Sequence, residues 1–222
     1  MNSHGFLSKS VDKKVIELIR SEVSIFLKSE VQKSNYYKNI SEKIDHLNDL
    51  INPSLYTKVS NLLANSSPQL LAIELHVQEA GCPGIPAHQD NFYHHIDPLD
   101  GLKILIPLQS MDRSQGALIF LNNEVNSPVL EHCSSDFANF SSFINKNIID
   151  SLEFTTTSYS YLEGDCSYHF MNSIHFSDGN KTNLDYYFLV YRFQKPNPKI
   201  DLKLRSEYEK CYANHLQKIN IN

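Results

Sequence analysis

The pattern of apolar and polar positions divides the chain into a helical first part and a strand-rich remainder. From Val11 to Val31 apolar residues recur every three or four positions with Lys and Glu between them, which predicts an amphipathic helix. Similar spacing predicts a second helix over Ile40 to Leu50 and a third over Leu55 to Ala64, with Asn52-Pro53-Ser54 as the break between them. We expect these helices to form a layer that packs on a sheet.

The pattern changes after Pro68, where runs of β-branched and aromatic residues alternate with turn signals. These runs predict short strands at Leu70 to Gln78, Leu102 to Leu108, Ala117 to Leu121, Phe154 to Leu162, Cys166 to His175 and Tyr186 to Phe193. Residues Asn122 to Asp150 look irregular, with a short helix near Phe137 to Ile144, and Arg205 to Lys218 predicts a closing helix. Many short strands without helices between them exclude a parallel βαβ sheet and favour an antiparallel sandwich or jelly roll.

Length and composition add few constraints. The 222 residues suit one domain, with a helical layer over 1–66, a jelly-roll core over 67–194 and a C-terminal helix over 195–222. A net charge of −5 and scattered basic residues argue against nucleic acid and anionic membranes as partners. No secretory signal or membrane span is evident, and the four cysteines show no CxxC spacing, so we expect a cytoplasmic protein with reduced thiols.

Candidate metal chemistry centres on the stretch Ala87-His88-Gln89-Asp90. His88 and Asp90 are two residues apart in a turn-rich loop, and a later strand brings His175. Two neutral imidazole nitrogens and one carboxylate oxygen on one side of an octahedron suit Fe(II), and they leave the opposite positions open for other ligands. We therefore expect these three residues to be both the metal ligands and the catalytic centre.

The chain resembles the phytanoyl-CoA dioxygenase family of the Fe(II)/2-oxoglutarate oxygenases. The matching parts are Pro86-Ala87-His88-Gln89-Asp90, the stretch LKILIPLQSMDRSQGALIFL, and GDCSYHFMNSIHFSDGNKT, in which Gly164-Asp165, His175, Ser177, Asn180 and Thr182 fall at the family's spacing. The resemblance implies a double-stranded β-helix, a cupin-like jelly roll that is mainly β with flanking helices. It also implies iron on His88, Asp90 and His175, with 2-oxoglutarate as co-substrate.

The co-substrate half of the motif departs from the family. The arginine that normally anchors the distal carboxylate of 2-oxoglutarate corresponds here to Tyr186. Arg192 is six residues further along that strand, about 20 Å away, and we expect it to be a poor substitute. Lys103, a lysine in an apolar run, is our candidate anchor, with Ser177 and Tyr186 donating hydrogen bonds; the alternative is an ammonium that reaches solvent at the start of its strand.

The remaining polar residues near these motifs have more ordinary expected roles. We expect His169 to be a packed core histidine, Gln89 to be structural, and Asn180 and Thr182 to shape the turn after His175. We expect His94 and His95 on a surface loop close to Asp90, with substrate contact by one of them as the less favoured alternative. His76 lies on its predicted strand, where lining the cavity is the less favoured role.

These observations favour an Fe(II)/2-oxoglutarate-dependent dioxygenase that uses O2 to hydroxylate or otherwise oxidise a small molecule, such as an amino acid derivative or a natural-product intermediate. The presence of Asp90 indicates oxidation and not halogenation, because related halogenases carry a small residue there. Two alternatives stay open. One is a non-haem iron oxygenase or oxidase on the same fold that does not use 2-oxoglutarate, and the other is a non-catalytic jelly roll that binds a metal or ligand.

Overall fold

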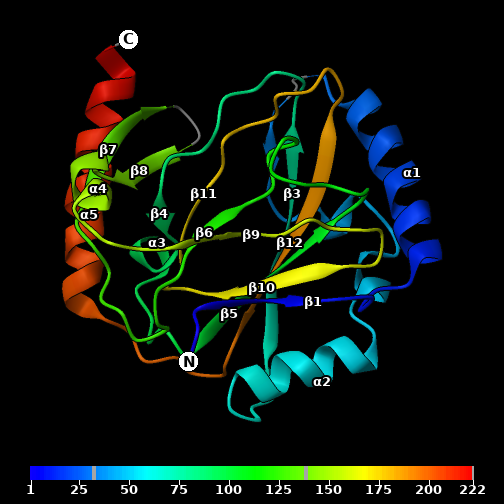
Figure 1. The fold of residues 1–222 in the computed structure, drawn as a ribbon, viewed down its shortest axis with the longest axis horizontal. Helices are drawn as coiled ribbons and strands as arrows, with labels where there is room; N and C mark the ends of the chain where they lie inside the picture. Colours follow the sequence, from blue (N-terminus) through cyan, green and yellow to red (C-terminus); the bar gives the residue numbers. More distant parts are fainter. Residues whose placement is uncertain (32–33, 138–139, 222) are drawn as a thin grey trace.

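Two antiparallel sheets face each other at the centre of the molecule. The computed structural model describes residues 1–31, 34–137 and 140–221. The large sheet has the strand order β1-β10-β5-β12-β3-β2, formed by His4–Leu7, Cys166–Phe170, Gly101–Pro107, Tyr186–Gln194, Gln69–Gln78 and Tyr36–Tyr37. The small sheet has the order β4-β11-β6-β9, formed by His88–Gln89, Ile174–Phe176, Ile119–Leu121 and Thr156–Ser158 (Figure 1). The predicted jelly-roll core, a double-stranded β-helix, is confirmed.

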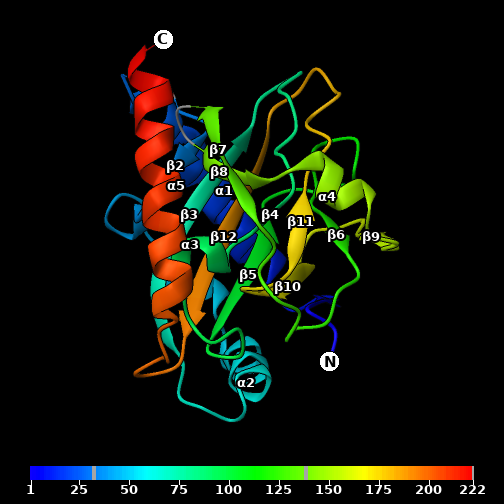
Figure 2. The same ribbon diagram turned by 90° about the vertical axis from the view of Figure 1, so that its left-hand side faces the viewer.

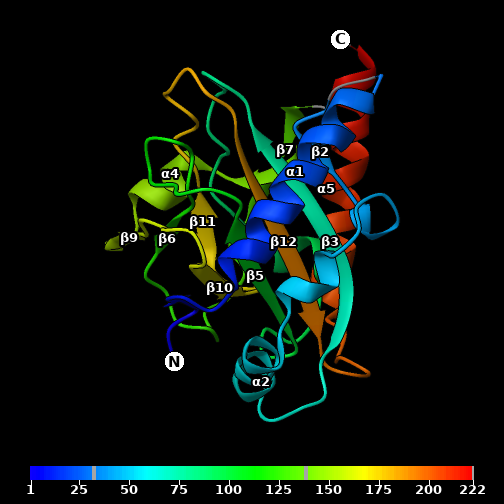
Figure 3. The same ribbon diagram turned by 90° about the vertical axis from the view of Figure 1, so that its right-hand side faces the viewer.

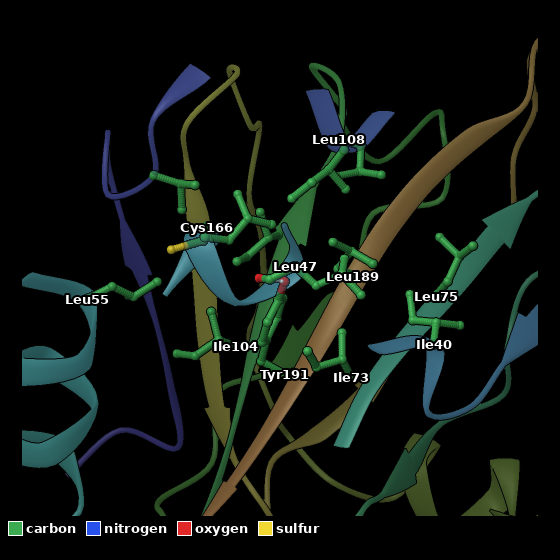
Figure 4. Close-up of a cluster of buried hydrophobic side chains, with 14 of the residues drawn as sticks. Ile40, Leu47, Leu55, Ile73, Leu75, Ile104, Leu108, Cys166, Leu189 and Tyr191 are labelled. Carbon is green, nitrogen blue, oxygen red and sulfur yellow. Dashed lines mark hydrogen bonds between the residues drawn. The ribbon is translucent and has the colours of Figure 1, made fainter. Parts of the chain in front are cut away.

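Helices cover the outer face of the large sheet, as the apolar stripes predict. Helix α1 (Lys13–Ser29) begins at the N-cap Asp12, whose carboxylate accepts the Lys14 N–H, and α2 (Pro53–Leu62) begins at Asn52. In the side view α1 crosses over β3 and β12, and α2 lies at the lower end of these strands (Figure 3). Their buried residues meet one face of those strands in a single apolar cluster, where Leu47, Leu55, Ile104, Leu189 and Tyr191 converge (Figure 4).

The segment from Ile40 to Leu50 differs from the predicted helix. It forms two short 3₁₀ helices, η1 (Ile40–Glu42) and η2 (Leu47–Leu50). Asn39 and His46 precede them in the left-handed conformation, with φ of 50° and 58°, so the chain turns before each one. The apolar spacing of three that suggested a helix is the spacing at which side chains of a 3₁₀ turn stack on one side.

The segment expected to be irregular contains a β-hairpin. Strands β7 (His132–Phe137) and β8 (Phe140–Ile144) pair with each other, and helix α4 (Lys146–Asp150) follows. The helix predicted near Phe137 to Ile144 is therefore wrong where the structure describes it, and residues 138–139 lie outside the described part. Buried positions alternate along the second half of β8, so one side of the strand packs inward against neighbouring structure. Helix α5 (Leu202–Ile221), longer than predicted, runs along this hairpin (Figure 2).

The run from Cys166 to His175 is two strands and not one. Strand β10 ends at Phe170, and β11 begins at Ile174 in the other sheet. This crossing moves His175 from the large sheet to the small one. Strand β9 (Thr156–Ser158) is shorter than predicted, and β1 (His4–Leu7), which has no clear strand pattern, adds to the edge of β10.

No helix in the described part of the chain is long and apolar enough to cross a bilayer. All four cysteines are free thiols.

Candidate metal centre

The small sheet brings the three predicted metal ligands together. His88 lies on β4, directly opposite His175 on the antiparallel strand β11, and Asp90 follows β4 at the start of the short helix α3 (Asn91–His94). One ligand atom from each residue lies within 4.8 Å of the others. The exposed fractions are 8% for His88, 4% for Asp90 and 4% for His175, so the cluster is buried.

Backbone carbonyls fix the tautomer of both histidines. Nδ1 of His88 lies 3.0 Å from the Pro86 carbonyl oxygen, and Nδ1 of His175 lies 3.0 Å from that of Ser173. Because a carbonyl oxygen only accepts, each Nδ1 carries the proton, and each Nε2 keeps its lone pair. Burial lowers the pKa of both imidazoles to about 3, which keeps them neutral at pH 7.

Asp90 is a charged carboxylate with a partner on each oxygen. Burial alone would raise its pKa, but the Lys103 ammonium and the hydrogen bond from His169 outweigh burial and hold the pKa well below its usual range. Oδ1 accepts from Lys103 Nζ at 2.7 Å, and Oδ2 lies 3.0 Å from His169 Nε2. Oδ2 is also 3.9 Å from His175 Nε2. A carboxylate oxygen has a second lone pair, so Oδ2 can still coordinate a cation beside the two imidazoles. This donor set fits a divalent metal ion.

Buried hydrogen bonds hold the loop that carries His88 and Asp90. The Gln89 side chain donates to the Asn172 carbonyl and accepts the Leu130 N–H, as expected of a structural residue. His132 of the β7–β8 hairpin accepts the Gln89 N–H at 3.2 Å and stacks on Phe92 with ring centroids 4.2 Å apart. The position of β4 therefore depends on a hairpin that sequence reasoning did not predict.

Strand pairing brings three basic side chains into one row on the inner face of the large sheet. Lys103 on β5 is directly opposite His169 on β10 and directly opposite Arg192 on β12. Arg192 is far from Tyr186 when the distance is measured along β12, which is why the sequence made it a poor candidate. Across the sheet, however, its neighbour is Lys103, which contacts Asp90. His169 is buried as expected, yet it contacts Asp90 and is more than a packing residue.

Arg192 also reaches towards the segment that follows Asp90. Its Nη1 donates to Nδ1 of His94 at 2.9 Å. His94 was expected on a surface loop, but it is half-buried at the end of α3, four residues after Asp90. Burial lowers the pKa of His94 to about 3, and the charges of Lys103 and Arg192 act in the same direction.

The other predicted co-substrate residues lie near the opposite end of β12. The Ser177 hydroxyl donates to the Gly116 carbonyl at 3.1 Å and accepts the Gly179 N–H at 3.0 Å. Tyr186 is half-buried against an apolar cluster between the sheets. Asn180 accepts the backbone N–H and the hydroxyl of Thr182, so both residues shape the turn after β11 as expected.

Comparison with known proteins identifies structural neighbours only. No protein-family model matches the chain, and no curated protein matches its sequence. A solved structure described as the non-heme monooxygenase ThoJ in its apo form aligns over 98% of this chain and 95% of its own, with a TM-score of 0.71 and 14% identity.

Two further neighbours are structures with bound ligands. The epimerase SnoN in complex with Fe3+, alpha ketoglutarate and nogalamycin RO covers 90% of this chain and 81% of its own, with a TM-score of 0.72 and 14% identity. EvdO2 from Micromonospora carbonacea var. aurantiaca complexed with 2-oxoglutarate covers 90% and 89%, with a TM-score of 0.70 and 14% identity. These likenesses do not confirm the narrower phytanoyl-CoA dioxygenase-like family. This chain has the jelly-roll fold of the structurally characterised non-haem iron and 2-oxoglutarate oxygenases.

Proposed function

We propose that this protein is a non-haem Fe(II)/2-oxoglutarate-dependent oxygenase that oxidises a small molecule. The observation that carries the proposal is the buried set His88, Asp90 and His175, in which one ligand atom of each residue lies within 4.8 Å of the others. Both Nε2 atoms are unprotonated because each Nδ1 donates to a backbone carbonyl. Structural neighbours that bind iron and 2-oxoglutarate share the fold around this set.

Each residue would have a distinct role in this chemistry. His88, Asp90 and His175 would hold Fe(II), which when bound with 2-oxoglutarate supplies the O2-activating chemistry. Lys103 and His169 keep the Asp90 carboxylate charged and oriented. Because all three residues are buried, they would shield a bound metal from water on the side of the protein.

Anaerobic titration of the protein with Fe(II), with and without 2-oxoglutarate, tests the proposal. We expect iron to bind near neutral pH and a weak visible absorption band to appear only when 2-oxoglutarate chelates the metal. His175→Ala should abolish both signals, because two ligands hold a metal far more weakly than three. Arg205→Met, which removes an arginine paired with Glu209 on the exposed surface of α5, is the matched control.

The uncharged Tyr186 at the family's arginine position favours one alternative, an iron enzyme that does not use 2-oxoglutarate. Iron binding without the visible band would support that alternative and contradict the proposed co-substrate. A protein that binds no iron would leave only a ligand-binding role.

A further inference from the structure

We propose that Arg192 anchors the distal carboxylate of the dicarboxylate co-substrate. Arg192 lies near the last residue of β12, whereas the family's arginine corresponds to Tyr186, the first residue of that strand. The inference rests on the proposed function and adds a binding residue at a new place in the fold. In this assignment Arg192, and not Lys103, takes the role of the arginine that the family carries at the position of Tyr186.

The hydrogen bonding of Arg192 is incomplete. Within the described residues its side chain donates to His94 only, and no carboxylate lies within ion-pair distance. Its Nε is buried and has no hydrogen-bond partner among those residues. Arg192 is half-buried, and its guanidinium has no anion beside it among the described residues. The planar set of donors of a guanidinium matches a carboxylate in a bidentate contact.

The position of Arg192 suits a ligand that starts at the metal. Arg192 is directly opposite Lys103, and Lys103 Nζ lies 2.7 Å from the metal-binding carboxylate of Asp90. Neighbouring strands lie about 4.8 Å apart, so the Arg192 backbone is one strand beyond Lys103. His94, which contacts Arg192, belongs to the short helix that begins directly after Asp90. A short dicarboxylate chelated at the metal through one end can therefore extend its other end towards the guanidinium.

Lys103 is a weaker candidate for the same role. Its ammonium is committed to Asp90, and its side chain is only 13% exposed. Tyr186 lies six residues from Arg192 along β12, about 20 Å away. A phenol lacks the paired N–H donors that make a bidentate contact with a carboxylate, and Tyr186 packs on apolar side chains.

The charge balance of the buried and half-buried side chains on this face also favours a dianion. Asp90 and Glu74 contribute two negative charges, and Lys103 and Arg192 contribute two positive charges, so these four cancel. Glu74 is on β3, directly opposite Val190, and its Oε2 lies 3.8 Å from Nε2 of His76. A divalent metal ion would add two positive charges, and a dicarboxylate would restore neutrality.

Binding of two α-keto acids to the iron-loaded protein without O2 tests the assignment. The probes are 2-oxoglutarate and 2-oxopentanoate, which has the same chain but no distal carboxylate. In R192M we expect the Kd for 2-oxoglutarate to rise by about 30-fold or more, as for loss of one partner of a buried charge pair. The Kd for 2-oxopentanoate and the Fe(II) affinity should stay unchanged. R192K, which keeps the charge but loses the bidentate contact, should give an intermediate Kd.

Three results would overturn the assignment: an unchanged 2-oxoglutarate Kd in R192M, an equal loss for both probes, or a selective loss of 2-oxoglutarate binding in Y186F but not in R192M. A wild-type protein that binds iron but shows no absorption band with either keto acid would instead contradict the proposed co-substrate. The two failures are therefore distinguishable.

Discussion

At the scale of single residues, Lys103 shows that the role of a side chain depends on the group that it contacts. A lysine in an apolar strand needs an anion, and its sequence context suggested the carboxylate of a co-substrate. The structure supplies the Asp90 carboxylate at 2.7 Å, so the need is met within the protein. In the proposed site Lys103 would act on a bound metal through Asp90, and the co-substrate contact expected of Lys103 from the sequence is instead proposed for Arg192.

Substitution of Lys103 by Met separates these two roles. We expect the Fe(II) affinity to fall by about 10- to 100-fold, the usual effect of removing a residue that orients a metal ligand, because Asp90 loses the partner on Oδ1. At saturating iron the affinity for 2-oxoglutarate should stay unchanged. Calorimetry of iron binding and the absorption band of the chelate measure the two affinities, and Lys103→Arg is the control that retains the charge. A selective loss of 2-oxoglutarate binding would instead make Lys103 the co-substrate anchor.

At the scale of elements, the site depends on close backbone packing between the turn before β4 and the end of β11. Ser177 N–H donates to the Ile85 carbonyl at 3.0 Å, which ties the two segments together. A Cβ atom at Gly84 would lie 1.9 Å from the Ser177 carbonyl oxygen, so only glycine permits this approach. His88 and His175 lie on the two strands that this contact holds in place.

The substitution Gly84→Ala should therefore separate the two strands. We expect a loss of about 1–3 kcal/mol in the free energy of unfolding, as for overpacking of a close contact, together with weaker Fe(II) binding. Gly81→Ala is the matched control. Gly81 has φ of +73°, and a Cβ atom added there would meet nothing within 4 Å, so alanine adds backbone strain alone and should leave iron affinity unchanged. Urea unfolding and iron titration give both quantities, and an equal loss of iron affinity in the two variants would refute this explanation.

At the scale of the whole molecule, the protein encloses several neutral histidines between its two sheets and beneath the hairpin. Burial lowers the pKa of His88, His94, His132 and His175 to about 3. In the unfolded chain each imidazole has a pKa of about 6.5. Between these values the unfolded state binds protons that the folded state does not, so stability falls as the pH falls below about 6.5.

Acidification of the metal-free protein should therefore lower its free energy of unfolding well before the carboxylates titrate. Once the imidazole is protonated in the unfolded chain, each such histidine lowers the free energy of unfolding by about 1.4 kcal/mol for every unit by which the pH falls. Urea unfolding at pH 7.5, 6.0 and 5.0 measures the slope. His132→Gln, which keeps an acceptor for the Gln89 N–H, should reduce it, whereas His46→Gln on the exposed surface should not. A stability that is flat from pH 7.5 to 5.0 would rule out this account.

The sequence by itself determined the features that depend on local spacing. The apolar stripe of α1, the runs of β-branched and aromatic residues in β3 and β12, and the short interval between His88 and Asp90 are all set by neighbours in the chain. The candidate ligand set, with two imidazoles and one carboxylate, was also predicted before any strand was paired.

Tertiary structure decided everything that depends on which strands pair and in which register. The crossing from β10 to β11 placed His175 opposite His88, and the pairing of β5 with β10 and β12 placed Lys103 between His169 and Arg192. Arg192 seemed remote when measured along its own strand, but strand pairing places it one strand from the residue that contacts Asp90. The physical reason is that strand register is fixed by contacts between segments that are far apart in the sequence. The burial of apolar faces selects these contacts, and no short stretch of sequence contains both partners.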